Sequence, residues 1–359
     1  MELGGGEQLL FENYLKDRKQ FVEVDTFRSP ILDSPEASVI QGSKMSGLLY
    51  NLYTNEVPLL YKLVHNTWFE KITNAKQIIF KNIEHLTVLF VDDATSIITF
   101  HNTNQLQTYL ESYYTLIEAF YSLNKLKINA DKTALLLSHK PKFKNQLKNV
   151  HFKANKFCIY PKGAIKILGS YIETELKLKV EIGKLTSCLH NRINEIKRLT
   201  PFTDSKTRLS FMNSQVMGKL NYMLPLYSHA SAPLITKLHK VQMKAARTVI
   251  GSYCFMKNTK YILGKCKWFN IRTMLTLSAI NNIHKILYNR APEPLYSLFR
   301  PYRRLVSHRN TNYTPKTKIF GEFYIYSGLA AYNKLQINDK TLPPKTFKKR
   351  LKKIYMSAS

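Results

Sequence analysis

The stretch that decides the fold is residues 85–100, HLTVLFVDDATSIITF. Two runs rich in β-branched and aromatic residues flank Asp92 and Asp93, and neither run contains Gly or Pro. This pattern predicts a strand, a two-residue turn and a second strand, with both acids at the tip of the hairpin. Asp tolerates the left-handed backbone of a tight turn better than most residues, although Asn-Gly is the commoner pair there.

Two carboxylates held side by side indicate a cation site. They repel each other unless one is protonated or a cation bridges them, and a hard divalent ion with oxygen ligands is the usual solution. The alternative is a solvated turn, which would be the better interpretation of an isolated Asp-Asp pair. The motifs around the pair therefore decide between the two interpretations.

The charge of the chain is large, positive and unevenly distributed. The 359 residues include 54 Lys and Arg against 24 Asp and Glu, a net charge of +30. Up to Glu173 there are 20 basic and 17 acidic residues, a net +3, whereas from Thr174 onward there are 34 and 7, a net +27. A basic surface in the second half points to a polyanionic partner, while the length allows two or three domains.

Cysteine usage and hydropathy place the chain inside the cell. The four cysteines are scattered without C-x-x-C spacing, which predicts reduced thiols rather than a zinc knuckle or a disulfide framework. No uninterrupted apolar stretch of about eighteen residues occurs, and the N-terminus lacks a signal peptide's basic and apolar regions. We expect an intracellular protein, cytoplasmic or nuclear, without a membrane anchor. A basic patch could still bind anionic lipid, but the companion motifs favour nucleic acid.

The first 175 residues predict an α+β fold, an antiparallel sheet with helices on one face. A helix is expected over residues 106–121, with Asn102 or Thr103 as its N-cap, because apolar residues recur there at helical spacing. Pro58 is expected to stop an earlier helix. The other expected elements are a helix at 8–19 and strands at 21–27, 134–137 and 165–172.

From residue 177 the pattern becomes helical and basic. A clear helix is expected over 234–249, with Lys240, Lys244 and Arg247 displayed on its outer side and Gly251 as its C-cap. We expect a helical thumb-like region over 176–255 and a basic helical or irregular region over 256–359. The basic segment 347–353 is either a nuclear localisation cluster or, the better interpretation, the solvated face of a terminal amphipathic helix.

Five short motifs follow one another along the chain, and their order and spacing carry a resemblance to a known family. They are Gln41-Gly42-Ser43, LYNLYTNEVP at 49–58, FVDD at 90–93, LKINADKT at 126–133, and Leu168-Gly169. In these motifs the chain resembles the C-terminal half of a non-LTR (LINE-type, jockey-like) retrotransposon reverse transcriptase. The continuation at 222–227, 238–247 and 323–335 is similar to the thumb and downstream region of such an element. The resemblance therefore covers nearly the whole chain.

The resemblance implies an incomplete reverse-transcriptase palm followed by a mainly helical thumb and a basic C-terminal region. The implied activity is RNA-directed DNA polymerisation by two-metal nucleotidyl transfer, with Mg²⁺ or Mn²⁺. The implied partners are an RNA template, a DNA primer and deoxynucleoside triphosphates. No membrane partner is implied.

The resemblance also assigns roles to residues. Asp92 would bridge the metal ions with Asp93 beside it, and the Gln41-Gly42-Ser43 turn would position template and incoming nucleotide. Lys132 would protonate the leaving pyrophosphate, with Asn129 shaping its turn, although a solvated turn lysine remains an equal alternative for Lys132. The hairpin at Leu168-Gly169 would grip the primer.

One departure from the family's pattern bears on activity. In the family a further metal-binding aspartate lies on a strand upstream of the helix matched here by residues 8–19, and no early acid of this chain stands at that position. Asp25 lies in an expected strand, but by resemblance that strand leads into the Gln41-Gly42 turn, so we take Asp25 as structural. Two hypotheses follow: a polymerase domain that is inactive unless another chain supplies the missing strand, or a non-catalytic nucleic-acid-binding remnant of a mobile element.

Overall fold

The computed structural model divides into two compact units, Met1–Lys162 and Gly163–Ser359. Each is described by itself. The structure describes residues 4–34, 42–65, 83–100, 105–139, 147, 150–154, 157–228, 230–251, 258–303, 311–315 and 324–357.

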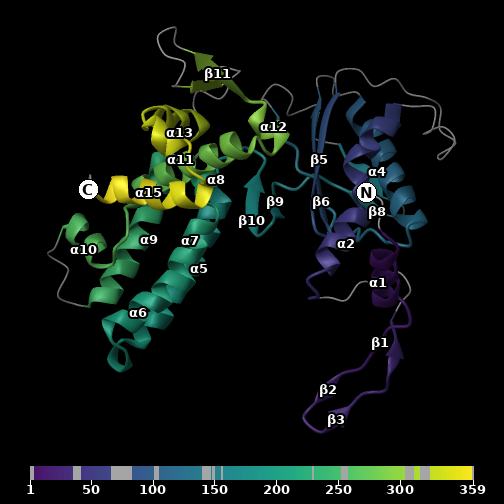
Figure 1. Cartoon of the computed structure of the whole chain (residues 1–359), viewed down its shortest axis with the longest axis horizontal. Helices are drawn as coiled ribbons and strands as arrows, with labels where there is room; N and C mark the ends of the chain where they lie inside the picture. Colours follow the sequence, from purple (N-terminus) through teal and green to yellow (C-terminus); the bar gives the residue numbers. More distant parts are fainter. Residues whose placement is uncertain are drawn as a thin grey trace. The chain divides into compact units, whose positions relative to one another are not determined.

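The centre of the first unit is the predicted hairpin (Figure 1). Strand β5 (Ile83–Phe90) pairs antiparallel with β6 (Asp93–Phe100) along its whole length. One face of this hairpin is covered by the helix α4 (Leu106–Leu123) and the 3-10 helix η1 (Val57–His65). The buried residues of this cluster are Val57, Leu60, Val64, Tyr109, Tyr113 and Leu116.

The rest of the first unit consists of short elements. Helix α1 (Gly5–Leu15) precedes a narrow ribbon in which β1 (Lys19–Gln20) pairs with β4 (Leu32–Asp33) and β2 (Glu23–Val24) pairs with β3 (Phe27–Arg28). Helix α2 is Ser46–Tyr53, and β7 (Phe152–Ala154) pairs with β8 (Phe157–Ile159).

The expected single sheet is not present among the described residues. The described strands form six separate two-stranded antiparallel pairs, so the α+β class is confirmed only in this coarse form. The expected strand at 134–137 makes one isolated bridge, Leu135 with Pro161. Leu135 and Leu137 instead pack their side chains against the cluster beneath α4, because apolar burial does not require a backbone ladder.

The expected strand at 21–27 is also wrong. The chain reverses at Asp25-Thr26, between β2 and β3, and Asp25 has φ +54. Asp is one of the few residues that adopt this left-handed backbone readily, and the apolar Val22, Val24 and Phe27 beside it are all exposed. No other part of the described chain covers these apolar side chains. The preference of Asp25 for a turn therefore decides the local backbone.

Two helix boundaries differ from the expectation. The N-cap residue of α4 is Gln105, without a side-chain cap hydrogen bond, and Asn102 and Thr103 lie outside the described residues. Pro58 does not end α2, which already ends at Tyr53, but is the second residue of η1. Proline is well tolerated there because the first N–H groups of a helix have no intrahelical partner.

The second unit begins with a hairpin and continues as helices. Strand β9 (Ala164–Ile167) pairs with β10 (Ser170–Glu173), so the single strand expected over 165–172 is two strands with a turn between them. The hairpin belongs to this unit although the expected boundary lay at residue 175. The helices that follow are α5 (Lys179–Arg198), η4 (Thr200–Phe202), α6 (Ser205–Met212), the π-helical turn η5 (Asn213–Met217), α7 (Gly218–Tyr222), α8 (Leu224–Tyr227) and α9 (Ala232–Ile250).

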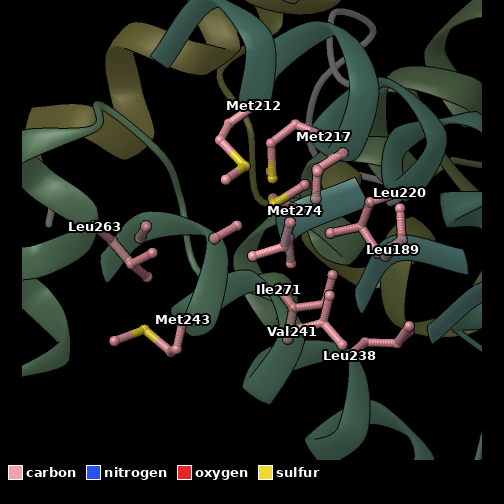
Figure 2. Close-up of a cluster of buried hydrophobic side chains, with 14 of the residues drawn as sticks. Leu189, Met212, Met217, Leu220, Leu238, Val241, Met243, Leu263, Ile271 and Met274 are labelled. Atoms are coloured by element: carbon pink, nitrogen blue, oxygen red, sulfur yellow. The ribbon is translucent and has the colours of Figure 1, made fainter. Parts of the chain in front are cut away.

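A large apolar core joins these helices to the start of α11 (Ile271–Asn289) (Figure 2). Leu189, Leu220 and Leu238 are fully buried in it. Four methionines also line the core, and their unbranched side chains fill the irregular gaps left where helices of different tilt meet. These methionines are Met212, Met217, Met243 and Met274.

A second core lies on the other half of α11, where α13 (Tyr324–Asn333) and α15 (Pro344–Ser357) pack. Gly328 allows α13 to approach, since a Cβ there would lie 2.7 Å from Ala279 Cβ. In α15, Phe347 and Leu351 are buried while the lysines between them are exposed, which confirms the amphipathic helix. The remaining elements are α10 (Thr259–Lys265), α12 (Glu293–Tyr296), β11 (Phe299–Arg303) paired with β12 (Thr311–Pro315), and α14 (Ile337–Lys340).

The expected helix over 234–249 is confirmed as α9, with Gly251 at its C-cap in a positive-φ conformation, φ +100. Of the three basic residues expected on its outer side, Lys240 is exposed, whereas Lys244 and Arg247 are half-buried. No helix among the described residues is both long and apolar enough to cross a bilayer.

Candidate functional site

The tip of the β5–β6 hairpin carries the two acids. Phe90 pairs with Asp93, so the two-residue turn is Val91-Asp92 and Asp93 is the first residue of β6. The turn thus lies one residue earlier than expected. The side chains that face α4 alternate along each strand, and this alternation fixes the pairing register of the two strands as far as the tip. Both carboxylates are exposed to solvent.

Val91 has an unfavourable backbone. Its φ of +54 lies in the left-handed region, which a β-branched residue adopts at a cost of about 1 to 2 kcal/mol. Such a conformation persists only where the surrounding structure imposes it. At this position the ladder on both sides of the turn imposes it.

A polar network beneath the tip holds the hairpin in place. The Thr87 hydroxyl lies 2.8 Å from the Tyr113 hydroxyl, 2.9 Å from Ser96 Oγ and 2.9 Å from His85 Nε2. His85 Nδ1 lies 2.7 Å from the Tyr109 hydroxyl of α4. Hydrogen-bonded groups in a low-dielectric interior hold one arrangement, so the strands that carry the acids are fixed to α4.

We did not assign His85, Thr87 or Ser96 from the sequence. The sequence did indicate that they face α4. Each of them lies two residues from an apolar residue on that face of its strand, Ile83, Leu89 or Ile98. Only the structure shows that their partners are tyrosines one helical turn apart.

Helix α2 lies close to the acids. Burial raises the pKa of Tyr50, and the negative charge of Asp92 raises it further. Tyr121 of α4 belongs to the same group of rings: burial and the neighbouring Tyr50 and Tyr113 raise its pKa to about 12. The Tyr53 hydroxyl donates to the carbonyl of Asn124 at 2.7 Å and ties α2 to the end of α4. Among the motifs that precede the hairpin, the α2 motif therefore lies within range of the Asp92 charge.

The turn before α2 is only partly described. Gln41 lies outside the described residues, and Gly42 has φ +84, a conformation that favours glycine. Ser43 Oγ accepts a hydrogen bond from the Tyr14 hydroxyl at 2.7 Å and one from the Met45 N–H at 3.3 Å. Ser43 thus links α1 to the start of α2.

The Asn129 side chain caps the turn at 129–133 in the way that an N-cap residue caps the start of a helix. Asn129 Oδ1 accepts from the Lys132 N–H at 3.2 Å, and the Asn129 carbonyl accepts from the Thr133 hydroxyl at 2.9 Å. The Lys132 side chain is exposed. Asn129 therefore fixes the backbone of the turn on which Lys132 stands.

The turn of the β9–β10 hairpin is Leu168-Gly169, with φ of +46 and +87. Two successive left-handed residues are the requirement of a type I′ hairpin turn, and glycine meets it without strain. The Tyr222 hydroxyl donates to the Leu168 carbonyl at 2.8 Å and so fixes the turn to α7.

A buried carboxylate holds the second strand of the same hairpin, close to its turn. Glu181 of α5 accepts from the Tyr171 N–H at 2.7 Å and from the Tyr227 hydroxyl at 3.1 Å. Burial, together with the Glu181 charge, raises the pKa of Tyr227. The hairpin is therefore a rigid extension of the helical unit.

As a metal centre the hairpin tip is incomplete within the described residues. Asp92 and Asp93 supply carboxylate oxygens, the ligands that Mg²⁺ and Mn²⁺ prefer. In the described ranges no three side chains of His, Cys, Asp or Glu gather into a metal-binding group. The tip offers two ligands, and a two-metal centre requires at least one more carboxylate.

Neither a scan against protein-family models nor a search of curated proteins finds a match to the chain.

Proposed function

We propose that the chain is a reverse-transcriptase palm and thumb that holds an RNA template paired with a DNA primer, with Asp92 as a ligand of the catalytic metal ions. The observation that carries the proposal is the hairpin tip, where Asp92 and Asp93 are exposed together on strands fixed by a buried polar network. The five ordered motifs support the same assignment. The two-metal site needs one more carboxylate than the tip provides.

The residues of the tip suit this role. Asp93 stands beside Asp92 at the start of β6, and Mg²⁺ or Mn²⁺ bound there would stabilise the charge that develops on the transferring phosphoryl group. The charge of Asp92 reaches Tyr50 of α2, where it adds to the effect of burial in raising the pKa of the phenol. The side chain of Lys132 is exposed on a turn whose backbone is fixed by Asn129. A proton donor to pyrophosphate needs this accessibility.

The test is template-primed nucleotide incorporation by the whole chain with Mg²⁺ or Mn²⁺. Asp92→Ala should abolish incorporation, whereas Asp33→Ala, which removes another exposed acid of the same unit outside the five motifs, should leave it nearly unchanged. Incorporation that survives Asp92→Ala would show that Asp92 is not a metal ligand. Equal losses in both variants would point to a general effect of charge.

The second candidate function is nucleic-acid binding without catalysis. The incomplete carboxylate set of the described residues favours it, as does the net +27 of the second half. Retained binding of the template–primer duplex with no incorporation by the unchanged chain would select this function. Absence of both binding and incorporation would overturn both candidates.

A further inference from the structure

The ribbon formed by residues 19–34 is a two-stranded element without a core. Strands β1 and β2 follow one another along one side and β3 and β4 along the other, with β2 and β3 at the tip (Figure 1). Such a ribbon is marginally stable in water unless further strands or a helix join it. None of its large apolar side chains is buried; they are Phe21, Val22, Val24, Phe27, Ile31 and Leu32, exposed by 42 to 68%.

The two edges of the ribbon differ. The β3–β4 side contains one residue more between its paired positions than the β1–β2 side, which is a bulge at Pro30-Ile31. Proline has no N–H to donate and a bulge bends the strand, so this edge is protected against a further strand. The edge formed by residues 19–24 contains neither device.

The backbone of residues 19–24 presents hydrogen-bonding groups outward. The Val22 carbonyl accepts from the Ser29 N–H at 2.8 Å, and the Val22 N–H donates to Ser29 Oγ at 2.9 Å, so both groups of Val22 point into the ribbon. These groups alternate in direction along a strand, so those of Lys19, Phe21 and Glu23 point away from it. Among the strands that the structure describes, none pairs with this edge.

This edge is complementary to itself. Two copies of residues 19–23 can lie antiparallel about a two-fold axis at Phe21, with the outward backbone groups of one copy facing those of the other. Phe21 then lies opposite Phe21 of the partner subunit, and Lys19 of each copy lies opposite Glu23 of the partner subunit. Opposite charges and aromatic rings in directly opposed positions both stabilise antiparallel strands.

The side chains that would meet share one face of the ribbon. Lys19, Phe21 and Glu23 lie on the same face because successive side chains alternate. Arg28, which is paired with Glu23, carries its guanidinium 3.6 Å from the centroid of the Phe21 ring and so marks this face. The two ion pairs and the ring pair therefore form together, on one side of the joined strands.

The charge of the ribbon distinguishes a second copy from other occupants. Residues 19–34 contain two basic and three acidic residues, so a nucleic acid or an anionic membrane gains no net attraction there. The first unit carries a net +3 and the second a net +27, so two copies repel each other least through the first unit. The protected edge at Pro30 closes the assembly at two copies.

We propose that two copies of the chain associate through residues 19–23, joining their ribbons into one four-stranded antiparallel sheet. The interface is isologous, with Phe21 at its centre and a pair of Lys19 and Glu23 on either side. The contact is short and belongs to the class of weak, transient interfaces. The inference does not depend on the proposed function, since the ribbon lies outside the five motifs.

The test uses two charge-reversal variants of the whole chain. Glu23→Lys brings lysines together across the two-fold axis and Lys19→Glu brings glutamates together, so each variant alone should dimerise at least about tenfold more weakly than the unchanged chain. A mixture of the two variants restores both opposite-charge pairs and should form heterodimers of nearly unchanged affinity. Restored association also shows that both variants are folded.

Sedimentation equilibrium measures the association, with a fluorescent label on one variant to identify heterodimers. The protein is treated with nuclease, so that nucleic acid does not bridge two chains, and is studied at about 0.15 M salt. A range from about 1 to 200 μM covers a weak dimer. The matched control is Asp33→Lys, which makes the same change of charge opposite a basic residue of the ribbon, Lys19, but on the protected edge. It should leave the dimer affinity nearly unchanged.

Four outcomes would contradict the proposal. An unchanged chain that stays monomeric over the whole range would overturn it. Equal weakening by Asp33→Lys would overturn the pairing edge, because the effect would then be one of overall charge. A mixture of Glu23→Lys and Lys19→Glu that stays monomeric would overturn the register. Assemblies larger than a dimer would overturn the closure at Pro30.

Discussion

The two compact units differ in where they place polar and charged groups. Residues 1–162 contain 19 basic and 16 acidic residues, and residues 163–359 contain 35 and 8. In the first unit the buried hydroxyls of Thr87 and Tyr113 and a half-buried imidazole lie beneath two exposed acids, whereas in the second unit an apolar core lies beneath exposed cations. The acids proposed for chemistry and the cations proposed for binding therefore rest on different kinds of interior. Substitutions can therefore address them separately.

The apolar core of the second unit should give the largest effect. Leu238 is fully buried in α9, so Leu238→Ala should lower the free energy of unfolding by about 2 to 5 kcal/mol, through lost burial and the cavity left behind. Urea unfolding followed by Trp268 fluorescence measures it. Leu123→Ala at the end of α4, where the side chain is 80% exposed, should change stability by no more than about 0.5 kcal/mol. Equal effects of the two substitutions would remove the distinction between core and surface.

The polar network of the first unit should give the next largest effect. Thr87→Val keeps the shape of the side chain but removes the hydroxyl that contacts His85, Ser96 and Tyr113, and it should cost about 1 to 3 kcal/mol. Thermal unfolding followed by circular dichroism measures the loss. Thr99→Val, on the exposed face of β6, is the matched control and should be nearly neutral. If Thr87→Val left the stability to thermal unfolding unchanged, the network would not be what holds the acids in place.

Acid should weaken the second unit through His284. This residue is fully buried, stacked on Phe347, with Nε2 2.8 Å from the Leu342 carbonyl, and burial lowers its pKa. The unfolded chain, with a pKa of about 6.5, then binds the proton more readily than the folded one. The stabilisation is complete above about pH 6.5 and is lost as the pH falls through the lowered folded value.

Urea unfolding of the second unit at a series of pH values measures this loss. His284→Gln keeps a donor for the Leu342 carbonyl but does not titrate, so its stability should depend less on pH over this range. An unchanged pH dependence in that variant would assign the acid sensitivity to other groups.

The smallest expected effect is a gain of stability at the hairpin tip. Val91 has φ +54, and Asn tolerates that backbone better, so Val91→Asn should stabilise the first unit by about 0.5 to 1 kcal/mol. Thermal unfolding measures the gain, and nucleotide incorporation is assayed beside it. Greater stability with weaker incorporation would mean that the strained turn serves the chemistry; a loss of stability would show that the turn requires Val91.

Elements with a long local pattern were predictable from the sequence, whereas strands that need a neighbouring strand were not. The β5–β6 hairpin and α9 were predictable because period-2 and period-3.6 patterns run through many residues with few competing signals. The strands expected at 21–27 and 134–137 failed because an apolar pattern shows that side chains prefer burial but does not specify whether a strand lies alongside to pair.

The candidate site shows the same division. Asp92, Asp93, Asn129 and the Leu168-Gly169 turn could be chosen from the sequence, because adjacent acids and turn residues have strong local preferences. The network under the tip could not, since His85 and Thr87 meet tyrosines more than twenty residues away. The contact of Lys244 with Asn194 could not be predicted either, because it forms only when α5 and α9 pack.

Residue types and short-range periodicity were enough to predict the α+β class, the acidic hairpin tip and the concentration of positive charge in the second half. Three features follow only from the folded chain: the turn is Val91-Asp92, Glu181 and Tyr222 fix the second hairpin to the helices, and Asn194 of α5 orients Lys244. These features depend on which surfaces meet. A contact between distant segments is set by the packing of whole elements and leaves no local pattern in either segment.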